Sequence, residues 1–128
     1  MRTIVAVALL SLASTTVDAR DRWIGEWAGN CGQDVQCSIA IAPTRAGYAI
    51  SWVVADRMDA AKVLCRVDAT ALKNAQRLTF GDAPGYTIGM VGGGAAIAIS
   101  GTGTRGDDLV DCAGRPRKLP GTYSAIGD

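Results

Sequence analysis

Alternating apolar residues form the most regular pattern of the chain. Between Gly85 and Gly103, one alternating run ends at Val91 and a second begins at Ala95, and residues 92–94 between them are all glycine. A period of two is typical of a half-buried β-strand, and consecutive glycines can adopt the positive φ angles of a tight turn. The pattern therefore predicts a β-hairpin at the centre of the fold. Because a lone hairpin is only marginally stable in water, we expect further strands to pack against it.

The same alternation recurs along the chain from Trp23 onwards, and glycine and proline interrupt it. Two stretches are less regular: residues 55–61 could form a helical turn or a loop, and residues 68–76 fit a helix or a strand-turn-strand equally well. Besides the hairpin, strands are predicted at residues 23–28, 37–42, 48–54, 62–67, 78–80, 108–113 and 121–125. We therefore predict an all-β fold of about eight short strands, arranged as a small antiparallel barrel or a barrel-like sandwich.

The first residues of the chain have a different composition. Residues 1–3 are a short basic start, residues 4–13 are an apolar run, and residues 17–19 offer small side chains before a cleavage at Arg20. These three regions are typical of a secretory signal peptide, and the apolar run has about half of the roughly 20 residues that a membrane-spanning helix needs. We therefore expect residues 1–19 to be a signal peptide and residues 20–128 to be a single β domain, periplasmic or secreted and without a membrane anchor.

The four cysteines of the chain all lie in the expected mature part: Cys31, Cys37, Cys65 and Cys112. An even number of cysteines in a small exported domain favours disulfides. Zinc is the rival use, but paired C-x-x-C spacing is missing and an oxidising compartment disfavours free thiolates. Several pairings are possible. We favour Cys31 with Cys37, which closes a short loop, and Cys65 with Cys112, which brackets the central hairpin.

Charge and residue types argue against several classes of function. The chain has 13 basic and 12 acidic residues, and it contains no histidine. Nucleic-acid-binding domains usually carry a strong basic excess, so a nucleic-acid partner is not indicated. The lack of histidine removes the usual general base, the common nucleophilic triads and most zinc sites. We therefore expect no enzymatic activity, no cofactor and no metal ion.

Two short motifs lie close together before Cys112. Asp107, Asp108 and Asp111 lack the alternating oxygen ligands of a calcium loop, and aspartate is common in turns. Residues 105–107 spell the Arg-Gly-Asp tripeptide that integrins recognise, yet so short a match arises easily in a turn-forming stretch. Exposed turns therefore explain both motifs best.

Aromatic and basic side chains supply the candidate binding residues. Two of the three tryptophans stand at the start of the domain, where they could line the mouth of a barrel or fill its core. The basic residues follow the last cysteine in an expected loop, where they could meet an acidic partner surface or simply face water. The candidates are Trp23, Trp27, Arg115, Arg117 and Lys118.

The opening Gly25-Glu26-Trp27, the antiparallel strands of even length and the closing Gly121-Thr122-Tyr123 resemble the small calycin-type barrels. That group includes lipocalins, avidins and bacterial metalloprotease inhibitors of related shape. The resemblance implies a barrel that binds a small apolar ligand in its mouth or a protein through one end. The chain departs from the group in two ways, because it is shorter than a lipocalin and has only residues 20–22 where the inhibitors carry an N-terminal trunk.

We therefore expect an exported binding module that engages or inhibits a protein such as a hydrolase, through loops at residues 30–36 and 114–120. The alternative is a carrier of a small apolar ligand in a barrel mouth. An unfilled apolar interior would favour the carrier, whereas a packed interior with an exposed apolar patch would favour the protein binder.

Overall fold

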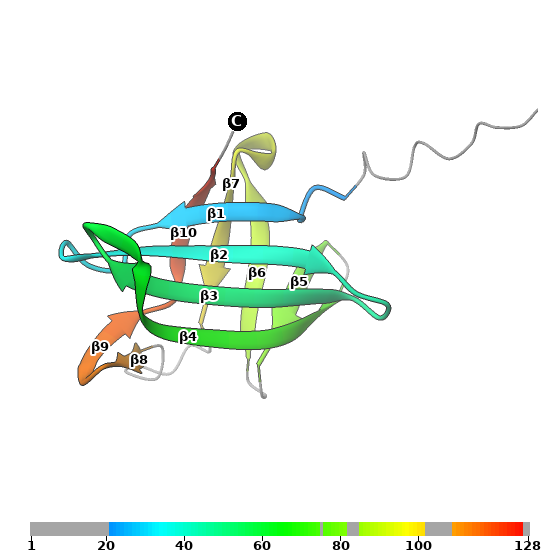
Figure 1. Cartoon of the computed structure of the whole chain (residues 1–128). Coiled ribbons are helices and arrows are strands. Elements are labelled where there is room, and N and C mark those ends of the chain that lie inside the picture. The colour runs from blue at the N-terminus through cyan, green and yellow to red at the C-terminus, as the bar shows by residue number, and fades with distance from the viewer. Residues whose placement is uncertain (1–20, 75, 82–84, 102–108, 127–128) are drawn as a thin grey trace, which may run out of the picture.

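Eight antiparallel strands close into a barrel in the computed structural model, which describes residues 21–74, 76–81, 85–101 and 109–126 (Figure 1). Two further strands form a separate hairpin, β8 (Leu109–Cys112) and β9 (Arg115–Lys118). The all-β barrel predicted from the alternation is confirmed. The barrel strands are β1 (Gly25–Gly29), β2 (Val35–Pro43), β3 (Tyr48–Asp56), β4 (Asp59–Asn74), β5 (Arg77–Phe80), β6 (Tyr86–Val91), β7 (Ala96–Ser100) and β10 (Gly121–Ala125).

The strands follow the order β1-β10-β7-β6-β5-β4-β3-β2 around the barrel. From β2 to β6, each strand therefore pairs with its predecessor and its successor in the sequence. After β7 the chain leaves the barrel, forms the β8–β9 hairpin and returns as β10, which pairs with β7 on one side and with β1 on the other. The first and last barrel strands thereby close the ring.

The predicted central hairpin corresponds to β6 and β7. Ile88 lies opposite Ile99, and Met90 lies opposite Ile97. The connecting turn is Gly92–Gly94, and its three glycines have φ angles of 61°, 70° and 103°. Residues with a side chain rarely adopt such angles, so glycine permits this turn.

The first irregular stretch of the sequence is almost entirely strand. β3 continues to Asp56 and β4 begins at Asp59, so the expected loop or helical turn at residues 55–61 shrinks to a turn at Arg57 and Met58. The register between β3 and β4 shifts near the start of β4. A β-bulge there accommodates the residues of β4 that have no partner on β3. Of the two alternatives for residues 55–61, the helical turn is therefore wrong, and the loop is reduced to this two-residue turn.

The second irregular stretch, residues 68–76, contains the end of β4. These residues pair with β3 as far as Ala71 and with β5 from Ala71 to Asn74. Pairing with neighbouring strands outweighs the weak helical spacing of the sequence.

Among the described residues, no helix is long and apolar enough to cross a membrane.

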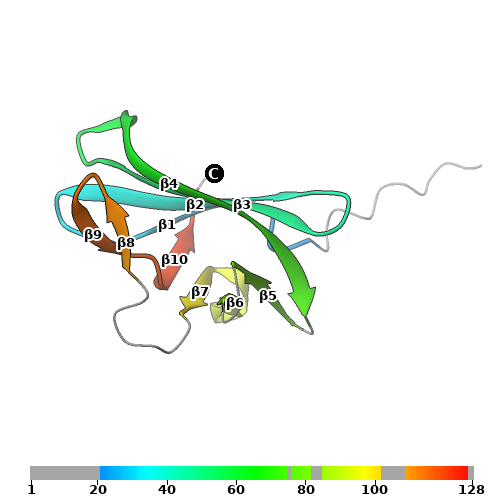
Figure 2. The same ribbon diagram turned by 90° about the horizontal axis from the view of Figure 1, so that it is seen from below.

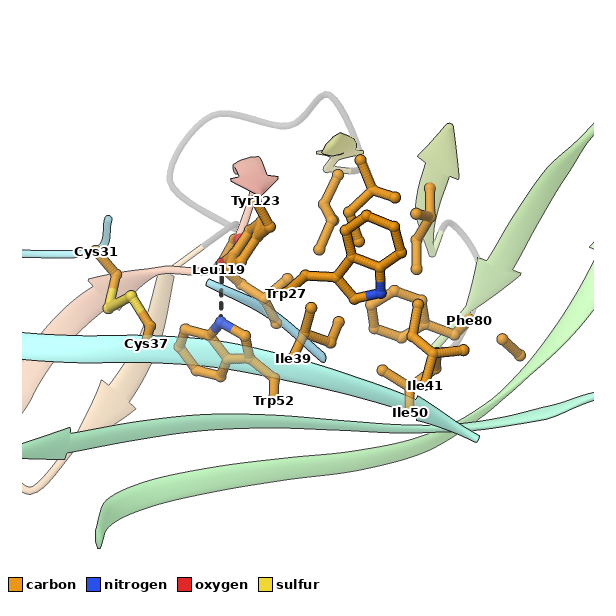
Figure 3. Close-up of a cluster of buried hydrophobic side chains, with 14 of the residues drawn as sticks. Trp27, Cys31, Cys37, Ile39, Ile41, Ile50, Trp52, Phe80, Leu119 and Tyr123 are labelled. Atoms are coloured by element: carbon orange, nitrogen blue, oxygen red, sulfur yellow. Dashed lines mark hydrogen bonds between the residues drawn. A yellow bond between two sulfur atoms is a disulfide. The ribbon is translucent and has the colours of Figure 1, made fainter. Parts of the chain in front are cut away.

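Large side chains fill the centre of the barrel (Figure 3). Trp52 is fully buried, and its indole Nε1 donates a hydrogen bond to the hydroxyl oxygen of Tyr123 at 2.9 Å. The Tyr123 hydroxyl in turn donates to the carbonyl oxygen of Leu119 at 2.6 Å. Burial raises the pKa of Tyr123 to about 12. This chain of hydrogen bonds joins β3 to β10 and to the segment that leads into β10 from the β8–β9 hairpin.

The basic loop expected at residues 114–120 is mostly strand β9, which pairs with β8 along its length. The connecting turn is Ala113 and Gly114, with φ angles of 54° and 87°. Two successive positive φ angles are typical of the type I′ turn, which suits the twist of a two-residue hairpin. The expected signal peptide and the Arg-Gly-Asp motif, residues 1–19 and 105–107, lie outside the described residues, as does Asp108.

Candidate functional site

The strand directions bring three connections together at one end of the barrel. These are the β1–β2 loop (residues 30–34), the β3–β4 turn (Arg57 and Met58) and the β8–β9 hairpin (Figure 1). We call them the cross-linked end. The two segments expected to bind a partner, residues 30–36 and 114–120, are thus brought side by side although they are far apart in the sequence. The turns at residues 44–47 and 92–94 lie at the opposite end.

Both predicted disulfides form at the cross-linked end. Cys31 joins Cys37 across the β1–β2 loop, and Cys65 of β4 joins Cys112 of β8. The first disulfide joins cysteines six positions apart in the sequence, whereas the second joins cysteines 47 positions apart and attaches the β8–β9 hairpin to the barrel wall. Both pairings favoured from the sequence are confirmed. Two disulfides in so small a domain are compatible with an oxidising, extracellular environment.

A buried arginine attaches the β8–β9 hairpin to the β1–β2 loop. The Nη1 and Nη2 atoms of Arg117 each donate to one carboxylate oxygen of Asp34 at 2.9 Å. Arg115 approaches the same carboxylate at 3.4 Å. The hydrogen bonds from Arg117 lower the pKa of Asp34 to about 2, and the carboxylate raises the pKa of Arg117. Such a bidentate pair has a fixed geometry, so it positions the hairpin against the loop.

The expectation for Arg117 as a surface contact needs correction. Its side chain is only 8% exposed, because the β9 strand turns it toward the β1–β2 loop and the Asp34 carboxylate compensates its charge. Gly32 makes this approach possible, since a Cβ atom there would collide with Nη1 of Arg117. Arg115 and Lys118 stay exposed on the same hairpin. The basic candidates therefore divide into one structural residue and two surface residues.

Hydrogen bonds with the β1–β2 loop and with the start of β2 also fix the β3–β4 turn. Nη1 of Arg57 donates to the carbonyl oxygen of Gln33 at 2.6 Å, and the Gln36 amide donates to the carbonyl oxygens of Asp56 and Arg57. The Asp56 carboxylate accepts from the backbone N–H of Met58 at 2.8 Å. The backbone of the turn is thus held on both sides.

The side chain of Met58 nevertheless projects into solvent and is 87% exposed. Sequence reasoning missed this residue, because nothing in an alternating strand pattern marks the tip of a two-residue turn. One signal was present: Arg57 and Met58 are not the glycine or asparagine that such turns usually contain. Exposed Arg57, Arg115 and Lys118 belong to the same end, as do exposed Asp59 and Asp111, so Met58 shares this end with charged side chains of both signs.

The two tryptophan candidates lie elsewhere, in the core. Trp23 and Trp27 are 7% and 4% exposed, respectively, and Nε1 of Trp27 donates to the carbonyl oxygen of Trp23 at 3.3 Å. Trp27 points inward because it alternates with exposed Glu26 and Ala28 on β1. The structure does not bring the tryptophans together with Arg115 or Lys118. Neither tryptophan therefore offers a surface to a partner in this structure.

A second surface feature lies where β4 meets β5. β4 pairs with β3 from Asp59 to Ala71 but with β5 only from Ala71 to Asn74, so its N-terminal part extends past β5 toward β8 and β9 (Figure 2). Among the described residues, no strand pairs with the other edge of residues 67–70. We call this stretch the unpaired edge of β4.

A cleft of about 420 Å³ runs along the unpaired edge, and a second of about 290 Å³ adjoins it. The rings of Phe80 and Tyr86 stack at a centroid distance of 5.1 Å and belong to both clefts. The larger cleft, which we call the β4 cleft, is lined by Val67, Asp68, Ala69, Thr70, Phe80, Gly81 and Tyr86.

Comparison of the chain with known protein families, with curated proteins and with solved structures found no match. The resemblance to calycin-type barrels therefore stays a prediction.

Proposed function

We propose that this protein is an exported binding module that engages a partner protein through its cross-linked end. The observation that carries the proposal is the contrast at the β3–β4 turn between a fixed backbone and the exposed side chain of Met58. Because the backbone of the turn is already fixed, binding through Met58 requires only its side chain to become ordered, which lowers the entropy cost of association. A few anchor residues that become buried supply much of the energy of protein interfaces.

Three exposed basic residues at the same end of the barrel as Met58 indicate the character of the partner surface. Arg57, Arg115 and Lys118 are exposed at the same end, while the carboxylate of Asp34 is already paired with two arginines. A partner with an acidic rim around an apolar pocket complements this arrangement, and opposite charges accelerate association. The active-site entrance of a hydrolase is one surface of this kind, and a rigid loop placed there would inhibit the enzyme.

The filled interior supports a protein binder over a carrier of a small apolar ligand. Trp52 and Tyr123 meet at the centre of the barrel and are hydrogen bonded to each other. A ligand entering there would have to displace these side chains and break that bond, at a cost typical of disrupting a packed core. Surface binding requires no such change.

We propose further that the module is not an enzyme and that it acts in the periplasm or outside the cell. The chain has no histidine, and the N-terminal pattern of residues 1–19 is typical of an export signal. The two disulfides suit the same compartments.

Site-specific photo-crosslinking tests the proposal. A photoreactive amino acid replaces Met58 in one variant and Val91 in another; Val91 is also exposed, but at the opposite end. We expect irradiation in the envelope and secreted fractions of the producing organism to yield a discrete protein adduct from position 58 and none from position 91. Adding Lys118→Glu should reduce the adduct several-fold, because it reverses the charge of one exposed basic residue at this end without touching the Asp34–Arg117 pair.

Three results would overturn the proposal: no adduct from position 58, equal adducts from both positions, or an adduct insensitive to Lys118→Glu. Circular dichroism of each variant serves as the folding control.

A further inference from the structure

We infer that the β4 cleft binds an extended segment of a partner protein, which adds to the sheet beside β4. This inference rests on the proposed function, because it describes how a partner protein would present part of its chain to this module. It concerns a different surface from the cross-linked end, so the two can be tested separately.

The unpaired edge of β4 dictates the shape of the occupant. Residues 67–70 pair with β3 on one side, and no described strand pairs with their other side. In a strand, every second residue directs its N–H and C=O groups to the same side. The groups on the free side are therefore spaced as a second strand requires, and an extended backbone is the ligand that matches them.

Neighbouring elements limit the length of the occupant. β5 takes the adjacent position from Ala71 onwards, and the disulfide from Cys65 to Cys112 places β8 beside the other end of the edge. About four residues of strand, or roughly 13 Å, fit between these limits. A short segment suits this window better than a long strand such as the β4 of a second copy, which would run into β5.

The walls of the cleft predict the side chains of the occupant. Successive residues of a strand point to opposite faces, so one set faces the stacked rings of Phe80 and Tyr86. Apolar or aromatic side chains suit that wall. Asp68 is the one charged residue among the described residues that line the cleft, and it forms a long ion pair of 3.9 Å with Arg66. Such an exposed pair is weak, so Asp68 can accept a lysine or arginine of the occupant.

The inference is tested with phage-displayed random short peptides, selected on the folded protein with its disulfides intact. We expect the selected sequences to combine a basic residue with an aromatic or large apolar one. Methylating the backbone nitrogens of a selected peptide one at a time should abolish binding at every second position, because alternate N–H groups face β4. Hydrogen exchange should show protection of amides within residues 67–70 on peptide addition.

Charge reversal supplies a matched pair of variants. Asp68→Lys should weaken the selected peptide on the order of tenfold, a loss of about 1.4 kcal/mol, whereas Asp111→Lys on β8 should leave its affinity unchanged. Both residues are exposed aspartates on strands, so an effect on folding would appear in both.

Several outcomes would overturn the inference. These are the absence of selectable peptides, a methylation pattern without the period of two, protection elsewhere than residues 67–70, or equal effects of the two reversals. Self-association through the same edge, detected by sedimentation and abolished by Asp68→Lys, would assign the cleft to a second copy and would also overturn it. An adduct from position 58 that persists in Asp68→Lys while no peptide binds would refute the inference alone, leaving the proposed function standing. Peptide binding without that adduct would refute the proposed docking through the cross-linked end alone.

Discussion

The two ends of the barrel hold their connections by different means. At the opposite end, the turn at residues 44–47 stabilises itself, because Thr44 N–H donates to Gly47 O at 2.9 Å and Gly47 N–H donates to the Thr44 hydroxyl at 3.0 Å. At the cross-linked end, a disulfide and an ion pair join segments 47 and 83 residues apart. Local hydrogen bonds thus stabilise the turn at one end, and long-range links hold the connections at the other end. Because contacts with distant segments hold the β3–β4 turn, it can contain residues such as Met58 that are uncommon in two-residue turns.

Removing the disulfides should give the largest difference between the ends. By the loop-entropy model, Cys65→Ala with Cys112→Ala should cost about 4 kcal/mol of unfolding free energy, and Cys31→Ala with Cys37→Ala about 2 kcal/mol, because the first pair closes the longer loop. Urea denaturation of both double variants measures these losses. Hydrogen exchange at residues 44–47 should stay native in each variant under native conditions. Equal losses, or faster exchange at that turn, would contradict the division into two ends.

The hydrogen bonds of Tyr123 connect the cross-linked end to the core, so Tyr123→Phe should destabilise the protein by about 1 to 3 kcal/mol. The change leaves the Trp52 indole without its acceptor and the Leu119 carbonyl without its donor. Tyr48→Phe is the matched control, because its hydroxyl donates to Asp21 in a partly exposed site near the opposite end. That variant should change stability by less than about 1 kcal/mol. A similar effect of both variants in thermal unfolding would refute this view.

Acid should loosen the cross-linked end specifically. The folded pKa of Asp34 is about 2 and lies below its usual value of 3.8, so the carboxylate stabilises the fold above about pH 4 and loses this contribution as the pH falls toward 2. Thermal melts from pH 6 to pH 2 should therefore show wild type and Asp34→Asn converging as the pH falls. Asp111→Asn serves as a control and should track wild type throughout. Parallel curves for wild type and Asp34→Asn would contradict the prediction.

The smallest expected effect concerns the β8–β9 turn. Ala113 has a φ of 54°, a conformation that alanine adopts at a cost and that asparagine tolerates. Ala113→Asn should therefore raise the unfolding free energy by about 0.5 kcal/mol. Ala95→Asn at the opposite end should give no gain, because Ala95 has an ordinary φ of −76°. A gain in the control variant alone would show that backbone strain does not limit the hairpin.

Much of the barrel could be predicted from the sequence because it follows from local pattern. The glycines at residues 92–94 mark their own turn, and the alternation around Trp52 and Ile97 indicates which side chains face the core. Both disulfide pairings were also accessible, because short loops and bracketed hairpins limit the reasonable choices.

The candidate sites could not be predicted in the same way, because they depend on contacts between distant segments. Burial of Arg117 requires Asp34 and Gly32, which an inspection of the sequence around Arg117 does not reveal. The β4 cleft depends on the point at which β5 begins to pair with β4. That register follows from the closure of the whole barrel rather than from any pattern in residues 67–70.

The position of β10 between β1 and β7 sets the order in which the barrel can be completed. β10 pairs with Trp27 of β1, near the start of the domain, and with Ile99 of β7. Closure of the barrel therefore joins parts of the chain that are synthesised at very different times. Until residues 121–125 emerge, β1 and β7 both present open edges that can pair with other chains. Pairing between segments so far apart in the sequence slows folding. A newly made chain is therefore exposed to edge-to-edge aggregation until β10 has paired with β1 and β7.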